Sequence, residues 1–269
     1  MNKPSDLEQE IAKIEIELAN LDQKRKKLLN EISQLRQQAL QKNSTPQLSL
    51  NLQASTIDKN ASQEEKISLF RSFFKGREDV FPRRFENRKT GKPGYAPVCL
   101  NEWKNGICQK PKISCHKCNH REFIPISDET IRSHLTGVDP NGHASRDFSI
   151  GIYPLLPDET CWFLAVDFDK SAWADDVKAF METCESYQVP AALERSRSGN
   201  GGHVWIFFET AIPAASARKL GTLLVTNTMN RRPEIGMDSY DRFFPSQDTM
   251  PKGGFGNLIA LPLQKKPRS

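Results

Sequence analysis

The stretch Cys161-Trp162-Phe163-Leu164-Ala165-Val166-Asp167-Phe168-Asp169 is an apolar run that ends in two carboxylates one residue apart. A short apolar run closed by polar residues predicts a buried strand. Because residues i and i+2 of a strand project from the same face, Asp167 and Asp169 should lie side by side. Neighbouring carboxylates repel each other unless a metal ion or a base joins them. The pair therefore indicates a metal site or, more simply, a polar strand end with one capping and one solvated Asp.

Segments with alternating helix and strand patterns surround this run, which predicts an α/β or α+β fold. Ser127 should cap a short helix that ends at Gly137, and Gly76 should end an earlier helix. Cys161 and Cys184 lie on apolar faces and are expected in the core. The expected elements are helices over about 67–74, 128–135, 173–188 and 214–230 and strands over 161–168, 203–208 and 257–261.

The first 40 residues carry a heptad pattern, and a polar segment at 41–62 predicts a flexible linker to a main domain at 63–269. β-branched residues at one seam position and Leu at the other favour a parallel two-stranded coiled coil. We therefore expect a homodimer through residues 7–39, with a lone helix packed on the main domain as the alternative. The seam residues are Leu7, Ile11, Ile14, Leu18, Leu21, Arg25, Leu28, Ile32, Leu35 and Ala39.

Composition and charge bound the location and the partners. The 269 residues contain no run of about 18 apolar residues and no apolar core at the amino terminus, so neither a membrane span nor a signal peptide is expected. We expect a cytoplasmic protein whose six cysteines are thiols or metal ligands.

The net charge of +5 is modest, but eight basic residues and only three acids lie between Arg71 and Lys92, interleaved with phenylalanines. This mixture suits a phosphate backbone with bases stacked on rings; a solvated basic surface is the simpler alternative. The candidate nucleic-acid-binding residues are Lys75, Arg77, Arg83, Arg84 and Arg88.

Four further cysteines follow the spacing C-x8-C-x6-C-x2-C within a module of about residues 95–125; they are Cys99, Cys108, Cys115 and Cys118. The last two form a knuckle that lets both sulfurs reach one ion, and the other two complete a tetrahedral Zn²⁺ site. Four thiolates leave no open position, so this zinc should be structural. His116 or His120 could replace one of the cysteines.

A glycine-rich loop, Arg195-Ser196-Arg197-Ser198-Gly199-Asn200-Gly201-Gly202-His203, joins two strand-like segments. Its glycines let backbone N–H groups approach an anion, and its side chains add hydroxyl, guanidinium and imidazole donors. The loop is a candidate cradle for a triphosphate, with a tight hairpin turn as the plainer alternative. Its candidate nucleotide-binding residues are Arg197, Ser198, Gly199 and His203.

The acidic pair and this loop together predict a site for phosphate and metal. Hard oxygen ligands suit Mg²⁺ or Mn²⁺ rather than zinc. Two such ions would lower the pKa of an attacking 3′-hydroxyl and neutralise a leaving pyrophosphate.

These residues resemble the archaeo-eukaryotic primase superfamily, and most closely the primase domain of TOTE conflict systems and the CRISPR-associated primase-polymerases. The resemblance covers about residues 64–264. Besides the acidic pair and the 198–203 motif, it rests on the segments 69–80, 99–103, 153–156, 163–169, 203–208, 244–248 and 256–264.

The resemblance implies a two-layer catalytic core with an RRM-like sheet. It also implies metal-dependent synthesis or extension of a DNA or RNA primer on a single-stranded template, from nucleoside triphosphates. By position, Asp167 and Asp169 would bind the metal pair, while Ser198 and His203 would hold the phosphates.

The third carboxylate of such a site is best matched by Asp241, which follows an apolar residue; Asp248 and Asp238 are rivals. Proteins of this kind commonly continue past the segment that ends here near Gln264, often into a helicase. A helicase, or CRISPR proteins, are therefore candidate partners.

Two other classes of protein compete with this interpretation. A non-catalytic coiled-coil zinc protein that binds single-stranded nucleic acid would use the basic segment and the knuckle, but it leaves the acidic pair unexplained. A metal-dependent nuclease could also use Asp-x-Asp and His, although a phosphate-cradling loop argues for a nucleotide substrate.

Overall fold

The computed structural model describes residues 60–87, 89–140, 147–234 and 237–265. It also describes seven exposed helical residues, which are Glu10, Lys13, Glu17, Asn20, Gln23, Lys24 and Lys27. The chain divides into two compact units, Met1–Thr56 and Ile57–Ser269. The coiled-coil seam, residues 41–59 of the expected linker and Arg88 lie outside the described residues, so the predicted dimer and linker stay predictions.

The second unit alternates helices and strands along the chain. In order, its elements are α2 (Gln63–Phe73), β1 (Pro82–Glu86), β2 (Pro93–Pro97), the 3₁₀ turn η1 (Cys115–Lys117), α3 (Asp128–Thr136), β3 (Gly151–Ile152), β4 (Thr160–Asp169), α4 (Trp173–Ser186), β5 (Ala192–Arg195), β6 (Gly201–Pro213), α5 (Ala214–Arg231), β7 (Tyr240–Phe244) and β8 (Ile259–Ala260).

The central sheet has the strand order β5-β6-β4-β7, and all its neighbours are antiparallel. Helix α4 connects β4 to β5, and α5 connects β6 to β7. This succession of β-α-β-β-α-β is the split arrangement shared by ferredoxin-like folds. The mixed α/β class expected from the sequence is confirmed. Two further two-stranded pairs, β1-β2 and β3-β8, complete the unit.

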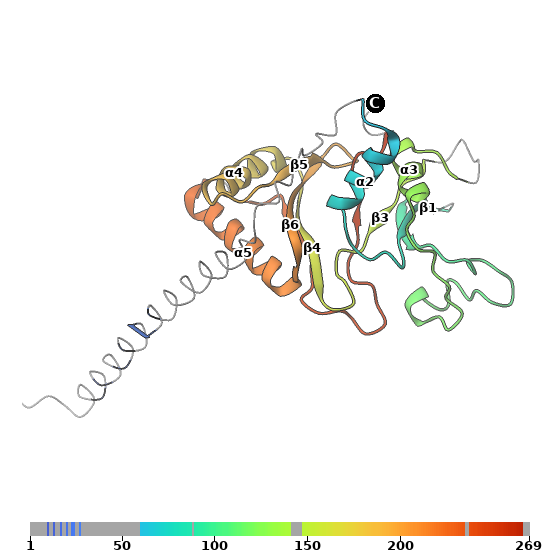
Figure 1. Cartoon of the computed structure of the whole chain (residues 1–269), viewed down its shortest axis with the longest axis horizontal. Helices are drawn as coiled ribbons and strands as arrows, with labels where there is room; N and C mark the ends of the chain where they lie inside the picture. The colour runs from blue at the N-terminus through green and yellow to red at the C-terminus, as the bar shows by residue number, and fades with distance from the viewer. Residues whose placement is uncertain are drawn as a thin grey trace, which may run out of the picture. The chain divides into compact units, whose positions relative to one another are not determined.

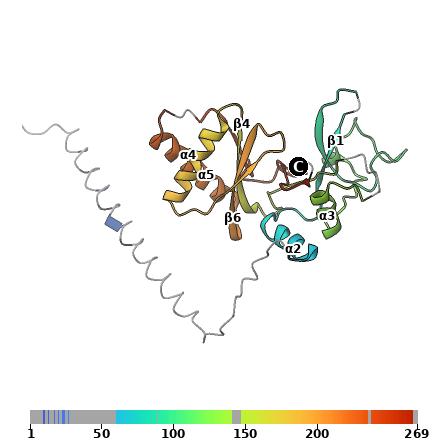
Figure 2. The ribbon, with the colours of Figure 1, turned by 90° about the horizontal axis from the view of Figure 1, so that it is seen from above.

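Both faces of the central sheet are covered, because β4 is buried over most of its length. Leu164, Val166 and Phe168 belong to the core formed with α4 and α5. The alternating residues Phe163 and Ala165 belong to a second core, formed with α2, α3 and β3-β8. Figures 1 and 2 show α4 and α5 on one side of the sheet and α2 and α3 on the other. Asp167 continues the second series, so it projects toward the α2 side.

The helix boundaries follow local capping chemistry. Ser62 and Glu65 form a reciprocal capping box at the start of α2. Ser127 accepts a hydrogen bond from the Thr130 N–H at the start of α3, and Gly137 ends that helix with a φ of 74°. Among the described residues, no helix is long and apolar enough to cross a membrane.

One strand expectation needs correction. The predicted strand at 257–261 forms only Ile259–Ala260, and it pairs with β3 outside the central sheet. The fourth strand of the central sheet is β7, which the sequence pattern did not reveal.

Candidate functional site

Three carboxylates meet at one end of the central sheet. Oxygen atoms of Asp167 and Asp169 on β4 and of Asp241 on β7 all lie within 4.8 Å of one another. We call this group the acidic triad. Mg²⁺ binds oxygens at about 2.0–2.1 Å, so ligands across an ion are about 4.2 Å apart. The triad's donor type and spacing therefore fit a hard divalent cation.

A β-bulge brings the third carboxylate to this face. Phe168 pairs with Tyr240, but the preceding Asp167 pairs with Arg242, so Asp241 is the extra residue of β7. Bulges commonly redirect a side chain near a functional site. Tyr240 packs against the core formed with α4 and α5. Asp241 turns toward Asp167 and Asp169 and accepts a hydrogen bond from Arg242 Nε at 2.6 Å.

The two rival acids lie elsewhere. Asp248 is paired with Arg218, at 2.5 Å between Oδ1 and Nη1. Asp238 contributes its backbone carbonyl, which accepts a hydrogen bond from Lys170 Nζ at 2.9 Å. Neither belongs to the acidic triad.

The pKa of Asp167 reflects its burial and the charges beside it. Burial is the largest cause that raises the pKa of this carboxyl from 3.8 to about 6. The positive charge of His203 opposes the shift, and the negative charges of Asp169 and Asp241 add to it. A carboxylate that is costly to ionise alone gains most from a bound cation.

His203 on β6 lies directly across from Asp167, with 3.4 Å between Nε2 and Oδ1. Its other ring nitrogen, Nδ1, lies 2.9 Å from Glu194 Oε2. Burial lowers the pKa of His203, but the hydrogen bond to Glu194 and the charges of Glu194, Asp167 and Asp169 raise it more. The imidazole is thereby held between two carboxylate groups, and in its charged form both nitrogens donate hydrogen bonds.

The glycine-rich loop closes the β5–β6 hairpin and lines a large cleft. This cleft has a volume of about 1010 Å³, and its walls include Arg197, Ser198, Gly199 and His203. Gly199 has a φ of 78°, a conformation that glycine adopts without strain. A Cβ atom on Gly201 would lie 2.5 Å from the Phe168 carbonyl oxygen and 2.6 Å from Asp169 Oδ1, so glycine is required for β6 to lie this close to the acidic end of β4.

Arg197 lines this cleft, and Arg84 lies close enough to affect it electrostatically. Arg197 forms an ion pair with Asp147 and lies 3.4 Å from Gln264 Oε1. Burial lowers the pKa of Arg197, and the positive charge of Arg84 lowers it as well. Arg84, which the sequence assigned to the basic stretch, therefore acts electrostatically on Arg197 of the glycine-rich loop.

The basic stretch is more extensively paired than its composition indicated. Arg77 is bonded to Asp79 and lies over the ring of Phe255, at 5.5 Å from the centroid. Arg84 donates to Glu86 at 2.9 Å. Acids two residues further along the strand or turn thus neutralise both.

The two other described candidates for nucleic-acid binding, Lys75 and Arg83, make different contacts. Lys75 Nζ lies 4.0 Å from the ring centroid of Trp162. The backbone of Arg83 forms an isolated bridge with Ile150.

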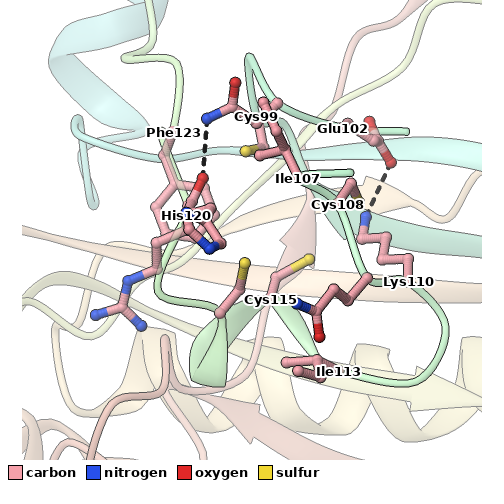
Figure 3. Close-up of a pocket in the computed structure, with 13 residues that line it drawn as sticks. Cys99, Glu102, Ile107, Cys108, Lys110, Ile113, Cys115, His120 and Phe123 are labelled. Carbon is pink, nitrogen blue, oxygen red and sulfur yellow. Dashed lines mark hydrogen bonds and ion pairs between the residues drawn. The ribbon is translucent and has the colours of Figure 1, made fainter. Parts of the chain in front are cut away.

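The four cysteines of the module at about residues 95–125 line one small cavity of about 20 Å³, together with His120 (Figure 3). The Glu122 N–H donates to Cys99 Sγ at 3.3 Å, and the short turn η1 joins Cys115 to Cys118. A space of this size holds about one water-sized sphere. Within the described residues the acidic triad alone brings three ligand atoms within 4.8 Å, so the thiols share a cavity at wider spacing. Cys161 and Cys184 are buried in the core, as predicted.

Comparison with protein families agrees with this geometry. The sequence model described as "TOTE conflict system, Archaeo-Eukaryotic Primase domain" matches residues 65–269. The chain belongs to this family. A search of curated proteins finds no match. Membership of this family supports a nucleotidyltransferase-type activity on nucleic acid and nucleotides.

Two acids in this primase domain escaped the sequence analysis. Glu194 Oε2 accepts from His203 and also from Trp205 Nε1, at 3.0 Å. Asp176, buried in the first turn of α4, accepts from both the backbone N–H and the hydroxyl of Ser239, just before β7. Only the strand register would have placed Glu194 opposite His203, and no pattern in the sequence pointed to Asp176.

Proposed function

We propose that the chain is a template-directed nucleotidyltransferase, a primase-polymerase that makes or extends DNA or RNA primers by a two-metal mechanism. One observation carries this proposal: the acidic triad lies directly beside a cleft whose walls carry hydrogen-bond donors for phosphate. The triad supplies oxygen ligands, and His203 links it to the cleft. A nucleoside triphosphate bound with its outer phosphates in the loop would place its α-phosphate, which the 3′-hydroxyl attacks, toward the triad.

Asp167, Asp169 and Asp241 would hold two Mg²⁺ or Mn²⁺ ions. Such ions, when bound, activate a 3′-hydroxyl and neutralise charge on a leaving pyrophosphate. The protein's own contribution is to fix these oxygens on two adjacent strands, so little rearrangement is needed during the reaction.

The loop and His203 would bind the triphosphate. Ser198 Oγ accepts from the Asn200 N–H and lies 3.1 Å from Ser196 Oγ, which orders the hydroxyl at the cleft. His203 in its charged form would donate from Nε2 to a phosphate oxygen while Glu194 holds Nδ1. Arg197 would exchange its pairing with Asp147 for a phosphate.

The cysteine module would bind one structural Zn²⁺ through Cys99, Cys108, Cys115 and Cys118. The shared cavity and the N–H donated to Cys99 Sγ support this part of the proposal, because bound thiolates accept such bonds.

Incubation of the protein with Mn²⁺ or Mg²⁺, a single-stranded template and labelled nucleotides tests the proposal. We expect new primers or extension of supplied ones, and loss of synthesis with retained template binding when Asp167 and Asp169 are both changed to Ala. Strand degradation in the absence of nucleotides would instead identify a nuclease. Template binding without synthesis under either metal would identify a binding protein.

A further inference from the structure

A row of aromatic rings extends from the catalytic end of the large cleft to the protein surface. His203, Trp205 and Phe207 alternate along one face of β6, and the rings of Trp205 and Phe207 are stacked at 6.1 Å with an interplanar angle of 8°. Phe73, the last residue of α2, continues the row with its centroid 5.0 Å from that of Phe207. We call Trp205, Phe207 and Phe73 the aromatic row.

The outer end of this row is accessible. Trp205 is buried and tied to Glu194, and Phe74 makes the contact of the α2 end with the core. Phe73, by contrast, is 44% exposed although it lines the large cleft. An exposed ring that lies outside the buried core clusters and lines a cleft is available to stack on a planar ligand.

A cation accompanies the rings at this end. Lys75 follows Phe73 by two residues and lies over the ring of Trp162. Trp162 immediately precedes Phe163, the strand partner of Phe207, so both contacts lie at the same end of the sheet. Rings interleaved with a basic side chain are the usual composition of a surface for single-stranded nucleic acid.

The position of this end favours a strand over a single nucleotide. Phe207 is four residues from His203, about 13 Å along the strand. A mononucleotide carries its phosphates at one end only, and the glycine-rich loop already supplies donors for them. A polynucleotide carries one phosphate for every base. A base stacked on Phe73 or Phe207 would therefore bring a phosphate of its own, which accounts for the cation Lys75 at this end of the sheet.

We propose that Phe73 and Phe207, with Lys75, form a stacking subsite for unpaired bases of the single-stranded template. Phe73 and Phe207 line the large cleft, and Lys75 lies outside its lining, over Trp162. This inference rests on the proposed function for the identity of the strand as template.

The test measures binding of a fluorescently labelled single-stranded DNA oligonucleotide by anisotropy. Stacking on one aromatic ring contributes roughly 1–3 kcal/mol, so Phe73→Ala should raise the Kd by about 5- to 150-fold. Phe73→Trp should preserve the affinity and Phe73→Leu should not, because only a ring can stack. Tyr187→Ala removes a ring that is 49% exposed but lies outside the cleft, and should leave the Kd unchanged.

The outcomes separate this inference from its rivals. An unchanged Kd for Phe73→Ala, or full rescue by Phe73→Leu, overturns it. An increased nucleotide KM with an unchanged template Kd would assign the rings to the incoming nucleotide and also overturn it. If the wild-type protein makes no product but Phe73→Ala still weakens DNA binding as expected, the stacking subsite stands and the proposed synthesis fails.

Discussion

Replacement of Asp167 by Asn should stabilise the metal-free protein while abolishing its activity. Asn has nearly the shape of a protonated Asp but no charge to bury. The pKa of Asp167 rises from 3.8 to about 6, and each unit corresponds to about 1.36 kcal/mol. The ionised carboxylate therefore costs the folded state about 3 kcal/mol at neutral pH. Because the side chain is only 13% exposed, solvent screening removes little of this cost.

Urea denaturation at neutral pH in the presence of a chelator measures this effect. We expect the unfolding free energy of Asp167→Asn to exceed that of the wild type by about 2–3 kcal/mol. The sign of the pH dependence follows from the raised pKa. Well below pH 4 both states of the wild type bind the proton and the difference in unfolding free energy vanishes; it grows between about pH 4 and 6 and stays constant above that range.

Added Mn²⁺ should reverse the order of the two proteins. A ligand at about 1,000 times its Kd stabilises the state that binds it by about 4.1 kcal/mol, which exceeds the roughly 2–3 kcal/mol expected for the substitution. The wild type should gain this stabilisation, and Asp167→Asn should gain little. A metal-free Asp167→Asn protein that is less stable than the wild type, or equally stabilised by Mn²⁺, would refute the reasoning.

Three further substitutions test separate parts of the site. Glu194→Gln removes the negative charge that strengthens the hydrogen bond to His203 and should lower kcat/KM for nucleotide addition by about 10- to 100-fold in steady-state assays, whereas Glu209→Gln, at an exposed position of β6, should not. Gly201→Ala should weaken Mn²⁺ binding, measured by calorimetry, because its added methyl group would collide with the Phe168 carbonyl oxygen and with the Asp169 carboxylate and so displace this end of β4. Cys115→Ser should lose the one zinc per chain expected by elemental analysis, whereas Cys161→Ser should retain it.

Each of these expectations has a contrary result. Normal kinetics for the Glu194 variant would remove its role in orienting His203. Wild-type Mn²⁺ affinity in the Gly201 variant would show that the loop can move away from the triad. Absence of zinc from the wild-type protein would leave the cysteine cavity without a metal.

Long segments with a clear pattern could be predicted from the sequence. The apolar run of β4 and the amphipathic faces of α2 and α4 contain enough residues to reveal their period, and Ser127 and Gly137 mark the ends of α3. The acidic pair and the glycine-rich loop were visible because their residue types are unusual at a strand end.

Short elements whose structure depends on pairing could not be predicted. Strand β5 has four residues that are mostly exposed, so it shows no alternation, and the contact of Glu194 with His203 exists only through the register of β5 on β6. Asp241 was one of three candidates, because only the bulge in β7 turns it toward Asp167. The pairing of the strands within the sheet therefore determines where the side chains of Glu194 and Asp241 lie.

Single-nucleotide insertion on four templates that differ only in the base opposite the incoming nucleotide tests the central claim most directly. Wild-type protein with Mn²⁺ should insert only the complementary nucleotide on each template. Asp241→Asn should abolish insertion, whereas Asp248→Asn, at an acid paired with Arg218 outside the triad, should retain it. Insertion that ignores the template base, or that survives in Asp241→Asn and fails in Asp248→Asn, would contradict the account.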